Sequence, residues 1–246
     1  MYSDRFYRDW TTDESLVRFG VRIRQSDLSV AADYDLSEMA IRALSKARRE
    51  VEEYSEENPT FATSLGPVPW GDDPPEVVRS MLIAADRWDM GPMAAVAGAL
   101  AESVGRFLLR YSDTVVVENG GDVFARGDRP LSISLYPGED SPFSHSLMVE
   151  VDAREVVGIC SSSAVVGPSL SLGCADLVTA VARCSADADA AATAIANRIK
   201  GPGDVGPVLE EERRSSGLLG LVACCGSKMG LWGELKLVSG NREVTV

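Results

Sequence analysis

The sequence predicts an α+β fold in which a module of strands and helices occurs twice. Apolar residues alternate with polar ones at a period of two in residues 16–33 and again after Thr114, which indicates strands. They recur at helical spacing between Leu36 and Tyr54, which indicates an amphipathic helix. The order of elements is also informative, because the helices stand in two groups and each group lies between strands.

The N-terminal half is predicted to hold a hairpin followed by helices. Residues 16–33 form the hairpin, and Asp35 is placed to cap the first helix together with Glu38. The stretch 58–75 is rich in Pro and Gly, so we expect an irregular connector, and a lip over a site is the alternative that its length allows. The next helices are expected at Pro75–Trp88 and Met93–Leu109. The second of these is apolar on nearly all sides and rich in small residues, which predicts a buried, closely packed helix.

The C-terminal half is predicted to be mostly strands, with one long helix and one short helix. The expected strands are Thr114–Glu118, Asp122–Arg126, Leu131–Tyr136, Leu147–Asp152, Val156–Cys160 and Leu177–Ala182. Ser185 is expected to cap a helix at Ala186–Lys200, and a shorter helix follows at 204–214. Leu218–Cys225 and Leu231–Val238 then form a closing hairpin. We take residues 1–246 as one domain with similar halves at about 14–112 and 113–240.

Composition excludes several classes of partner. The chain has 24 Lys and Arg against 37 Asp and Glu, a formal charge of −13, so it lacks the clustered cations that nucleic-acid binding requires. No apolar run approaches the ~20 residues of a membrane span. Five cysteines without metal-ligand spacing indicate reduced thiols in a cytoplasmic protein. A phosphate-bearing ligand therefore needs a local feature that overcomes a repulsive global charge.

The first candidate motif is Asn119-Gly120-Gly121-Asp122. Asn-Gly supplies the two positive-φ positions of a tight type I′ hairpin, which many proteins use for structure alone. The alternative interpretation is that two glycines leave the backbone N–H groups open to a ligand.

The second candidate motif is the run of small hydroxyl residues Ser161 and Ser162 after Cys160. It ends an apolar strand, where hydroxyls can hydrogen-bond a ligand, although an ordinary polar loop has the same composition. Cys160 stands beside this loop, and a buried thiol is its expected role.

The third candidate motif is the pair Asp189 and Thr193. Their spacing of four places a carboxylate and a hydroxyl on one helix face among alanines. Acidic residues also favour a first helical turn, and threonine can bond back to its own helix, so a structural role competes. An Asp–Thr pair with room for water and phosphate suits Mg²⁺.

Taken together and in this order, these motifs resemble the ApbE superfamily, the FAD-dependent protein FMN transferases and their relatives. That family has an AKGYAVD-like helix, an NAGGD hairpin, a TSG-type strand end and an ADALATA helix. The corresponding segments here are, in the same order, 96–102, 119–122, 161–162 and 188–194. The chain is still more similar to a cytosolic branch with Asn-Pro-x-Phe and Trp-Gly-Glu segments, here 58–61 and 232–234.

The resemblance implies an ApbE-like T-fold, with duplicated β-α-β modules, an antiparallel sheet and packed helices. It implies FAD and Mg²⁺ as cofactors, with the ion held by Asp189 and Thr193 and by a backbone carbonyl near Val96. The residues that it implies for the nucleotide are Gly98, Glu102, Asn119, Gly120, Gly121, Asp122, Ser161 and Ser162.

Two departures from the family pattern affect the expected reaction. The lysine of the AKG motif is Ala97 here, and Pro168 stands where the branch commonly has a histidine. Groups that would assist phosphoanhydride cleavage are therefore missing or moved, while metal and phosphate binding can survive.

Three functional hypotheses follow. The first is a Mg²⁺-dependent flavin-nucleotide protein, an FMN transferase if it is active, with an acceptor protein as partner. The second is a cytosolic protein of the same fold without transferase activity, which assists sulfur assimilation and binds a phosphorylated or sulfur-bearing metabolite or a protein partner. The third is an interaction module that forms a homodimer through helix 93–109 and the closing hairpin.

Overall fold

The computed structural model describes residues 15–144, 147–166, 172–215 and 217–239. Two similar successions of elements occur, each with an antiparallel strand pair, helices and a second strand pair. The first comprises β1 (Val17–Ile23), β2 (Ser26–Ala32), α1 (Ser37–Glu57), α2 (Pro59–Thr63), α3 (Glu76–Trp88), η2 (Pro92–Ala95), α4 (Val96–Leu108), β3 (Val115–Asn119) and β4 (Asp122–Arg126). The second comprises β7 (Val157–Ser162), β8 (Leu177–Ala182), α5 (Ser185–Arg198), η3 (Pro202–Asp204), α6 (Val205–Ser215), β9 (Gly220–Cys225) and β10 (Lys228–Gly233). The strands β5 (Leu131–Ser134), β6 (Leu147–Val151) and β11 (Leu235–Ser239) belong to neither succession.

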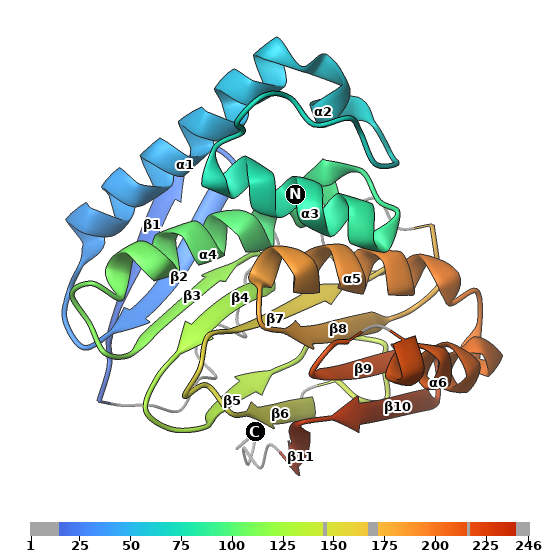
Figure 1. Ribbon diagram of the computed structural model, residues 1–246. Coiled ribbons are helices and arrows are strands. Elements are labelled where there is room, and N and C mark those ends of the chain that lie inside the picture. Colours follow the sequence, from blue (N-terminus) through green and yellow to red (C-terminus); the bar gives the residue numbers. More distant parts are fainter. Residues whose placement is uncertain (1–14, 145–146, 167–171, 216, 240–246) are drawn as a thin grey trace.

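These elements form three layers (Figure 1). The middle layer is an antiparallel sheet of eight strands in the order β1-β2-β3-β4-β7-β8-β9-β10. The helices cover one face, with α3 packed on α4 and α5, and the three-stranded sheet β11-β6-β5 lies against the other face. Two apolar clusters fill the space below the helices and a third fills the space between the sheets. The predicted α+β class with antiparallel sheets and packed helices is confirmed; the T-fold assignment and the division into halves near residue 112 stay predictions.

Strand register decides which side chains meet the helices. Val117 pairs with Phe124 across β3 and β4, and both belong to the cluster below α1 and α4. Because side chains alternate along a strand, Asn119 and its partner Asp122 also point toward the helices. The polar end of this strand pair therefore lies between the sheet and the helical layer.

The predicted closing hairpin is wrong in its second strand. The chain bends at Gly233, whose φ is +109° and where a Cβ would lie 2.2 Å from the Leu219 carbonyl oxygen. Because only glycine fits there, β10 ends at this residue and β11 joins the second sheet by pairing with β6. The hairpin itself is β9–β10, which closes after Cys225.

Two predicted helix caps are also wrong. Cys184 is the N-cap of α5 and Ser185 is its first residue, so Ser185 does not cap it. In α1 the N-cap is Leu36, although Asp35 Oδ1 still accepts a hydrogen bond from the Ser37 N–H at 2.9 Å. The helix expected at Met93–Leu109 begins as the 3₁₀ turn η2 and becomes α-helical at Val96.

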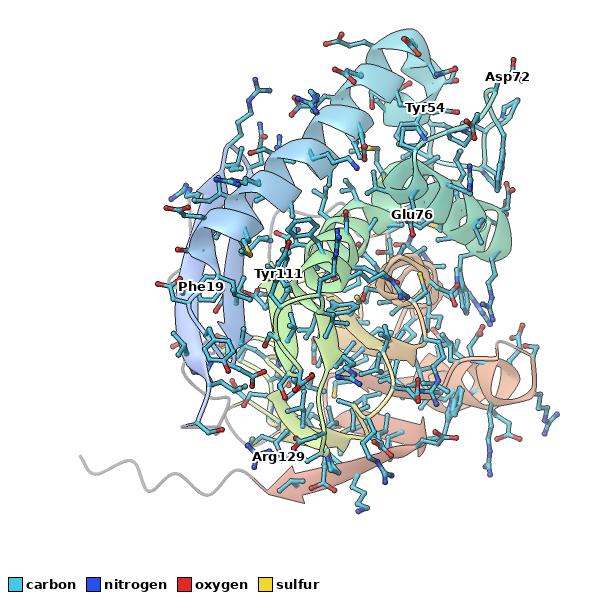
Figure 2. All side chains as sticks on the ribbon, turned by 60° about the vertical axis from the view of Figure 1, so that its left-hand side comes forward. Phe19, Tyr54, Asp72, Glu76, Tyr111 and Arg129 are labelled. Carbon is cyan, nitrogen blue, oxygen red and sulfur yellow. The ribbon has the colours of Figure 1, made fainter. Side chains whose placement is uncertain are left out.

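The connector 58–75 is less irregular than its composition predicts, because it contains α2 with Pro59 in its first turn. Phe61 is fully buried and meets the Tyr54 ring edge-on at 5.0 Å. Figure 2 shows Tyr54 on α1 close to the part of the connector that carries Asp72, and the Tyr54 hydroxyl accepts a hydrogen bond from the Gly71 N–H at 2.9 Å. The connector is thus anchored to α1.

Most apolar residues of α4 are buried inside the molecule, among them Leu100, Val104 and Leu108, whereas Val96 and Phe107 are partly buried. The homodimer through this helix and the closing hairpin stays a prediction. In the described portion of the chain, no helix combines the length and the apolar character that crossing a membrane demands.

Candidate functional site

The predicted glycine turn lies at the polar end of β3 and β4. Gly120 and Gly121 have φ values of +73° and +104°, as a type I′ turn requires. Nothing lies within 4 Å of the place where a Gly121 Cβ would be, so the turn faces open space on that side. The Gly121 N–H itself donates a hydrogen bond to Glu118 Oε1 at 2.8 Å. Beside it, Asn119 Nδ2 donates a hydrogen bond to the Ala97 carbonyl oxygen at 3.1 Å. The turn is therefore tied to the start of α4.

Asp189 of α5 reaches the same place from the helical layer. Its Oδ2 accepts a hydrogen bond from the Gly98 N–H at 2.9 Å, and only 8% of the residue is exposed. Asp122 is equally buried, and its Oδ1 has no hydrogen-bond partner. Among the residues that the structure describes, no Lys or Arg forms an ion pair with either carboxylate.

Burial shifts both acids toward their protonated forms, and the charge of Asp189 adds to the shift of Asp122. Burial raises the pKa of Asp189 to about 7, although hydrogen bonds from the Gly98 and Ala97 backbone oppose the shift. Burial, and then the charge of Asp189, raise the pKa of Asp122 well above its usual value. Two buried carboxyls without a counter-charge have the chemistry of a site for a cation.

Cys160 lies directly across from Asp122 in the β4–β7 pair and is fully buried. Its Sγ donates to the Ser185 carbonyl oxygen at 3.3 Å. Burial raises the pKa of the Cys160 thiol, and the charges of Asp122 and Asp189 raise it further. Because a thiolate is the reactive form, this cysteine acts as a buried structural thiol, as its sequence position predicts.

The two predicted serines do not point the same way. Ser162 is buried and lies two residues from Cys160, so it shares the helix-facing side of β7. Ser161 points to the opposite side, where its hydroxyl is 2.8 Å from the hydroxyl of Thr179. A ligand on the helix-facing side can therefore meet the Ser162 side chain but not that of Ser161.

The remaining predicted residues have different positions. Thr193 is half-buried and lies one turn beyond Asp189 on α5. Gly98 is in the contact between α4 and α5, where its N–H meets Asp189. Glu102 does not face the glycine turn: its Oε2 accepts a hydrogen bond from the Ser185 N–H at 2.6 Å, and its Oε1 lies 2.6 Å from Arg106 Nη2.

The sequence places Asp189 and the Asn119–Asp122 turn at one site but assigns only Asp189 to the ion, so the electrostatic coupling of Asp122 to Asp189 was not predicted. A signal existed, because a two-residue turn puts Asn119 and Asp122 opposite each other, and strand alternation puts Asp122 on the side of Phe124. Whether that side faced α5 depended on the packing of α4 and α5, which the sequence does not specify.

The donor set fits Mg²⁺. In the part of the chain that the structure describes, no three His, Cys, Asp or Glu side chains are grouped to hold an ion by themselves. Mg²⁺ is usually held by one or two carboxylates together with water and substrate phosphates, so two carboxylates suffice. The unpartnered Oδ1 of Asp122 is the atom that such an ion would satisfy.

The metal-free protein is expected to lose stability as pH rises from about 4 to about 7. A carboxyl whose pKa is raised by folding, as at Asp189, binds more protons in the folded state than in the unfolded state. Its contribution is therefore fully present below the ordinary pKa of about 4 and is lost as pH rises through the folded value. Denaturant unfolding in EDTA at several pH values measures the slope.

Asp122→Asn is expected to stabilise the metal-free protein at pH 8 by about 1–3 kcal/mol and to flatten its pH dependence. The amide removes the repulsion and supplies a donor next to Asp189, while its oxygen still accepts from the Ser161 N–H. The control is Asp113→Asn, at an exposed position at the other end of β3. A variant as pH-sensitive as the wild type would show that the Asp122–Asp189 pair does not set the slope.

Comparison with known proteins identifies relatives over most of the chain. A family model described as AbpE bacteria matches residues 8–209. A UPF0280 protein of Methanocaldococcus jannaschii is 38% identical over 208 residues, which cover 82% of this chain and 84% of the relative. A UPF0280 protein of Methanothrix thermoacetophila is 33% identical over 223 residues, 89% of this chain and 93% of the relative.

Solved structures have the same fold at low sequence identity. The flavinyl transferase ApbE of Pseudomonas stutzeri in its apo form has a TM-score of 0.56 and 14% identity, with 88% of this chain and 94% of that chain covered. The ApbE protein of Thermotoga maritima has a TM-score of 0.58 and 12% identity, with 85% and 94% covered. This likeness shows a shared fold. Together with the family match, it shows that the chain is an ApbE-like protein and belongs to the AbpE bacteria family.

Proposed function

We propose that the protein binds a flavin nucleotide, FAD, together with Mg²⁺ at Asp189, Thr193 and Asp122. One observation carries the proposal: a buried pair of carboxyls without a counter-charge, including the unpartnered Asp122 Oδ1, lies beside an open glycine turn. The ApbE-like fold supports a flavin nucleotide as the ligand, since solved structures of that fold are named flavin transferases.

The chain's own residues prepare this place for a phosphate group. Asn119 fixes the Ala97 carbonyl, and the space beside Gly121 is open. The Gly121 N–H donates to Glu118 Oε1 at 2.8 Å, so a phosphate would have to take over this hydrogen bond. No described Lys or Arg forms an ion pair with Asp122 or Asp189. The negative charge of a phosphate would therefore be neutralised by backbone amides and a bound cation. When bound, Mg²⁺ supplies charge neutralisation between the acids and the pyrophosphate.

Binding without FMN transfer is the second candidate. Ala97 favours it, because this position of the family motif then carries no amine. The segment 167–171, which includes Pro168 in place of the histidine, lies outside the described residues. A role in the cytoplasm in sulfur assimilation, with another phosphorylated or sulfur-bearing metabolite or a protein partner, belongs to this candidate.

Calorimetry with FAD, with and without Mg²⁺, tests the proposal. The expected result is that FAD binds only when Mg²⁺ is present. Absence of FAD binding at about 5 mM Mg²⁺ would refute the proposal. Mass spectrometry of a flavin-acceptor protein incubated with FAD and Mg²⁺ separates the two candidates. A mass increase by one FMN establishes transfer, and an unchanged mass with intact FAD binding establishes the second candidate.

A further inference from the structure

The first turns of α4 and α5 cap each other. The Gly98 N–H of α4 donates to Asp189 of α5 at 2.9 Å, and the Ser185 N–H of α5 donates to Glu102 of α4 at 2.6 Å. Glu102 follows Gly98 by four residues in α4, and Asp189 follows Ser185 by four residues in α5. The two residues of each helix therefore lie on one face, the face turned to the other helix. Figure 1 shows the two helices meeting at their N-terminal ends above the sheet.

The two carboxylates of this arrangement are not equivalent. Glu102 is neutralised by Arg106, whose Nε and Nη2 both contact Glu102 Oε1. Within the described part of the chain Asp189 has no such partner, and its charge acts on Asp122 instead. Glu102 therefore stabilises the contact between the two helices, and the Asp189 carboxylate remains available to bind a cation.

The contact between the helix starts leaves no room for adjustment. A Cβ on Gly98 would lie 2.3 Å from the Ser185 carbonyl oxygen and 2.9 Å from Asp189 Cβ. On the sheet side, a Cβ on Gly158 would lie 2.4 Å from Ser185 Cα. Ser185 is thus held between α4 and β7, and any shift of its backbone moves Asp189 one turn further along α5.

We propose that Glu102 is a positioning residue for the cation site, acting through the Ser185 N–H rather than on the ligand. It holds the start of α5 against α4, which keeps Asp189 on Gly98 and next to Asp122. This inference rests on the proposed function, because the ion at Asp189 is Mg²⁺ in both. It also assigns a different role to Glu102 from the nucleotide contact that the resemblance implies.

Titration with Mg²⁺ alone, followed by amide NMR of the full-length chain, tests this role. Glu102→Ala is expected to weaken Mg²⁺ binding about tenfold or more, the range for residues that orient metal ligands. It should also move the Gly98 amide proton upfield, because the hydrogen bond to Asp189 lengthens. Glu102→Gln keeps an oxygen acceptor for Ser185 and should stay within about threefold of the wild type.

Asp187→Asn is the matched control. It removes one charge from the same first turn of α5, but its carboxylate faces Arg87 and Trp88, each at 2.7 Å. Equal weakening by Asp187→Asn and Glu102→Gln would overturn the proposal in favour of a general charge effect. Glu102→Ala with unchanged Mg²⁺ affinity and an unchanged Gly98 signal would also overturn it.

Two further outcomes are decisive. If Glu102→Ala does not fold, Glu102→Gln carries the test, since a Gly98 signal like that of the wild type supports positioning and a displaced one overturns it. If the wild type binds no Mg²⁺, the proposed function and this inference fail together. If the wild type binds Mg²⁺ and Glu102→Ala binds it with the same affinity, this inference alone is overturned.

Discussion

Asp189→Ala is expected to weaken Mg²⁺-dependent FAD binding at least about 100-fold, because even residues that only orient metal ligands cost 10–100-fold when lost. The side chain is buried, and it is the only acid of α5 that faces Asp122. Its removal leaves Asp122 as the only one of the two buried acids and takes away the acceptor of the Gly98 N–H. Calorimetry with FAD at fixed Mg²⁺ measures the loss.

Asp189→Asn separates the charge from the hydrogen bond. The amide oxygen can still accept from Gly98, so the contact between α4 and α5 is retained while the negative charge is lost. We expect this variant to fold with wild-type cooperativity and to bind FAD as poorly as Asp189→Ala. Asp187→Asn, in the same helical turn but directed at Arg87 and Trp88, should bind like the wild type. Wild-type FAD binding by Asp189→Asn would refute a cation at this carboxylate.

Local sequence patterns were sufficient to predict most elements of the fold. The period-two alternation around Val117 and the helical stripe that ends at Tyr54 reflect which side is buried, and burial is a property that each segment expresses by itself. The Asn119–Asp122 turn was equally predictable, because positive φ at two positions demands Gly-rich chemistry. These predictions needed no knowledge of distant parts of the chain.

The errors arose where distant segments decide the local structure. Ser185 is a residue type that often caps helices, yet it is the first residue of α5, and its N–H donates to Glu102, which lies 83 residues earlier in the chain. Leu231–Val238 reads as one strand, but contact of Gly233 with Leu219 bends the chain and sends β11 to the second sheet. The Asp122–Asp189 pair belongs to the same class, since it exists only because α5 packs on β7 and β4.

Gly98→Ala is expected to destabilise the protein by about 2–4 kcal/mol, combining overpacking of 1–3 kcal/mol with weakened helix caps of ~1 kcal/mol each. The added methyl would stand 2.3 Å from the Ser185 carbonyl oxygen, which is backbone and cannot rotate away. The helices must separate, and both capping bonds at their N-termini lengthen as a result. The better helix propensity of alanine returns only about 1 kcal/mol, so the steric cost prevails.

Gly206→Ala is the matched control for this substitution. Gly206 also lies in the first turn of a helix, α6, but nothing is within 4 Å of the place of its Cβ. It should be neutral or gain up to about 1 kcal/mol. Denaturant unfolding of both variants measures the difference, and equal stabilities would disprove the close approach of α4 to α5. Since the same contact holds Asp189 in place, Gly98→Ala should also lose Mg²⁺ affinity under conditions where it remains folded, while Gly206→Ala keeps it.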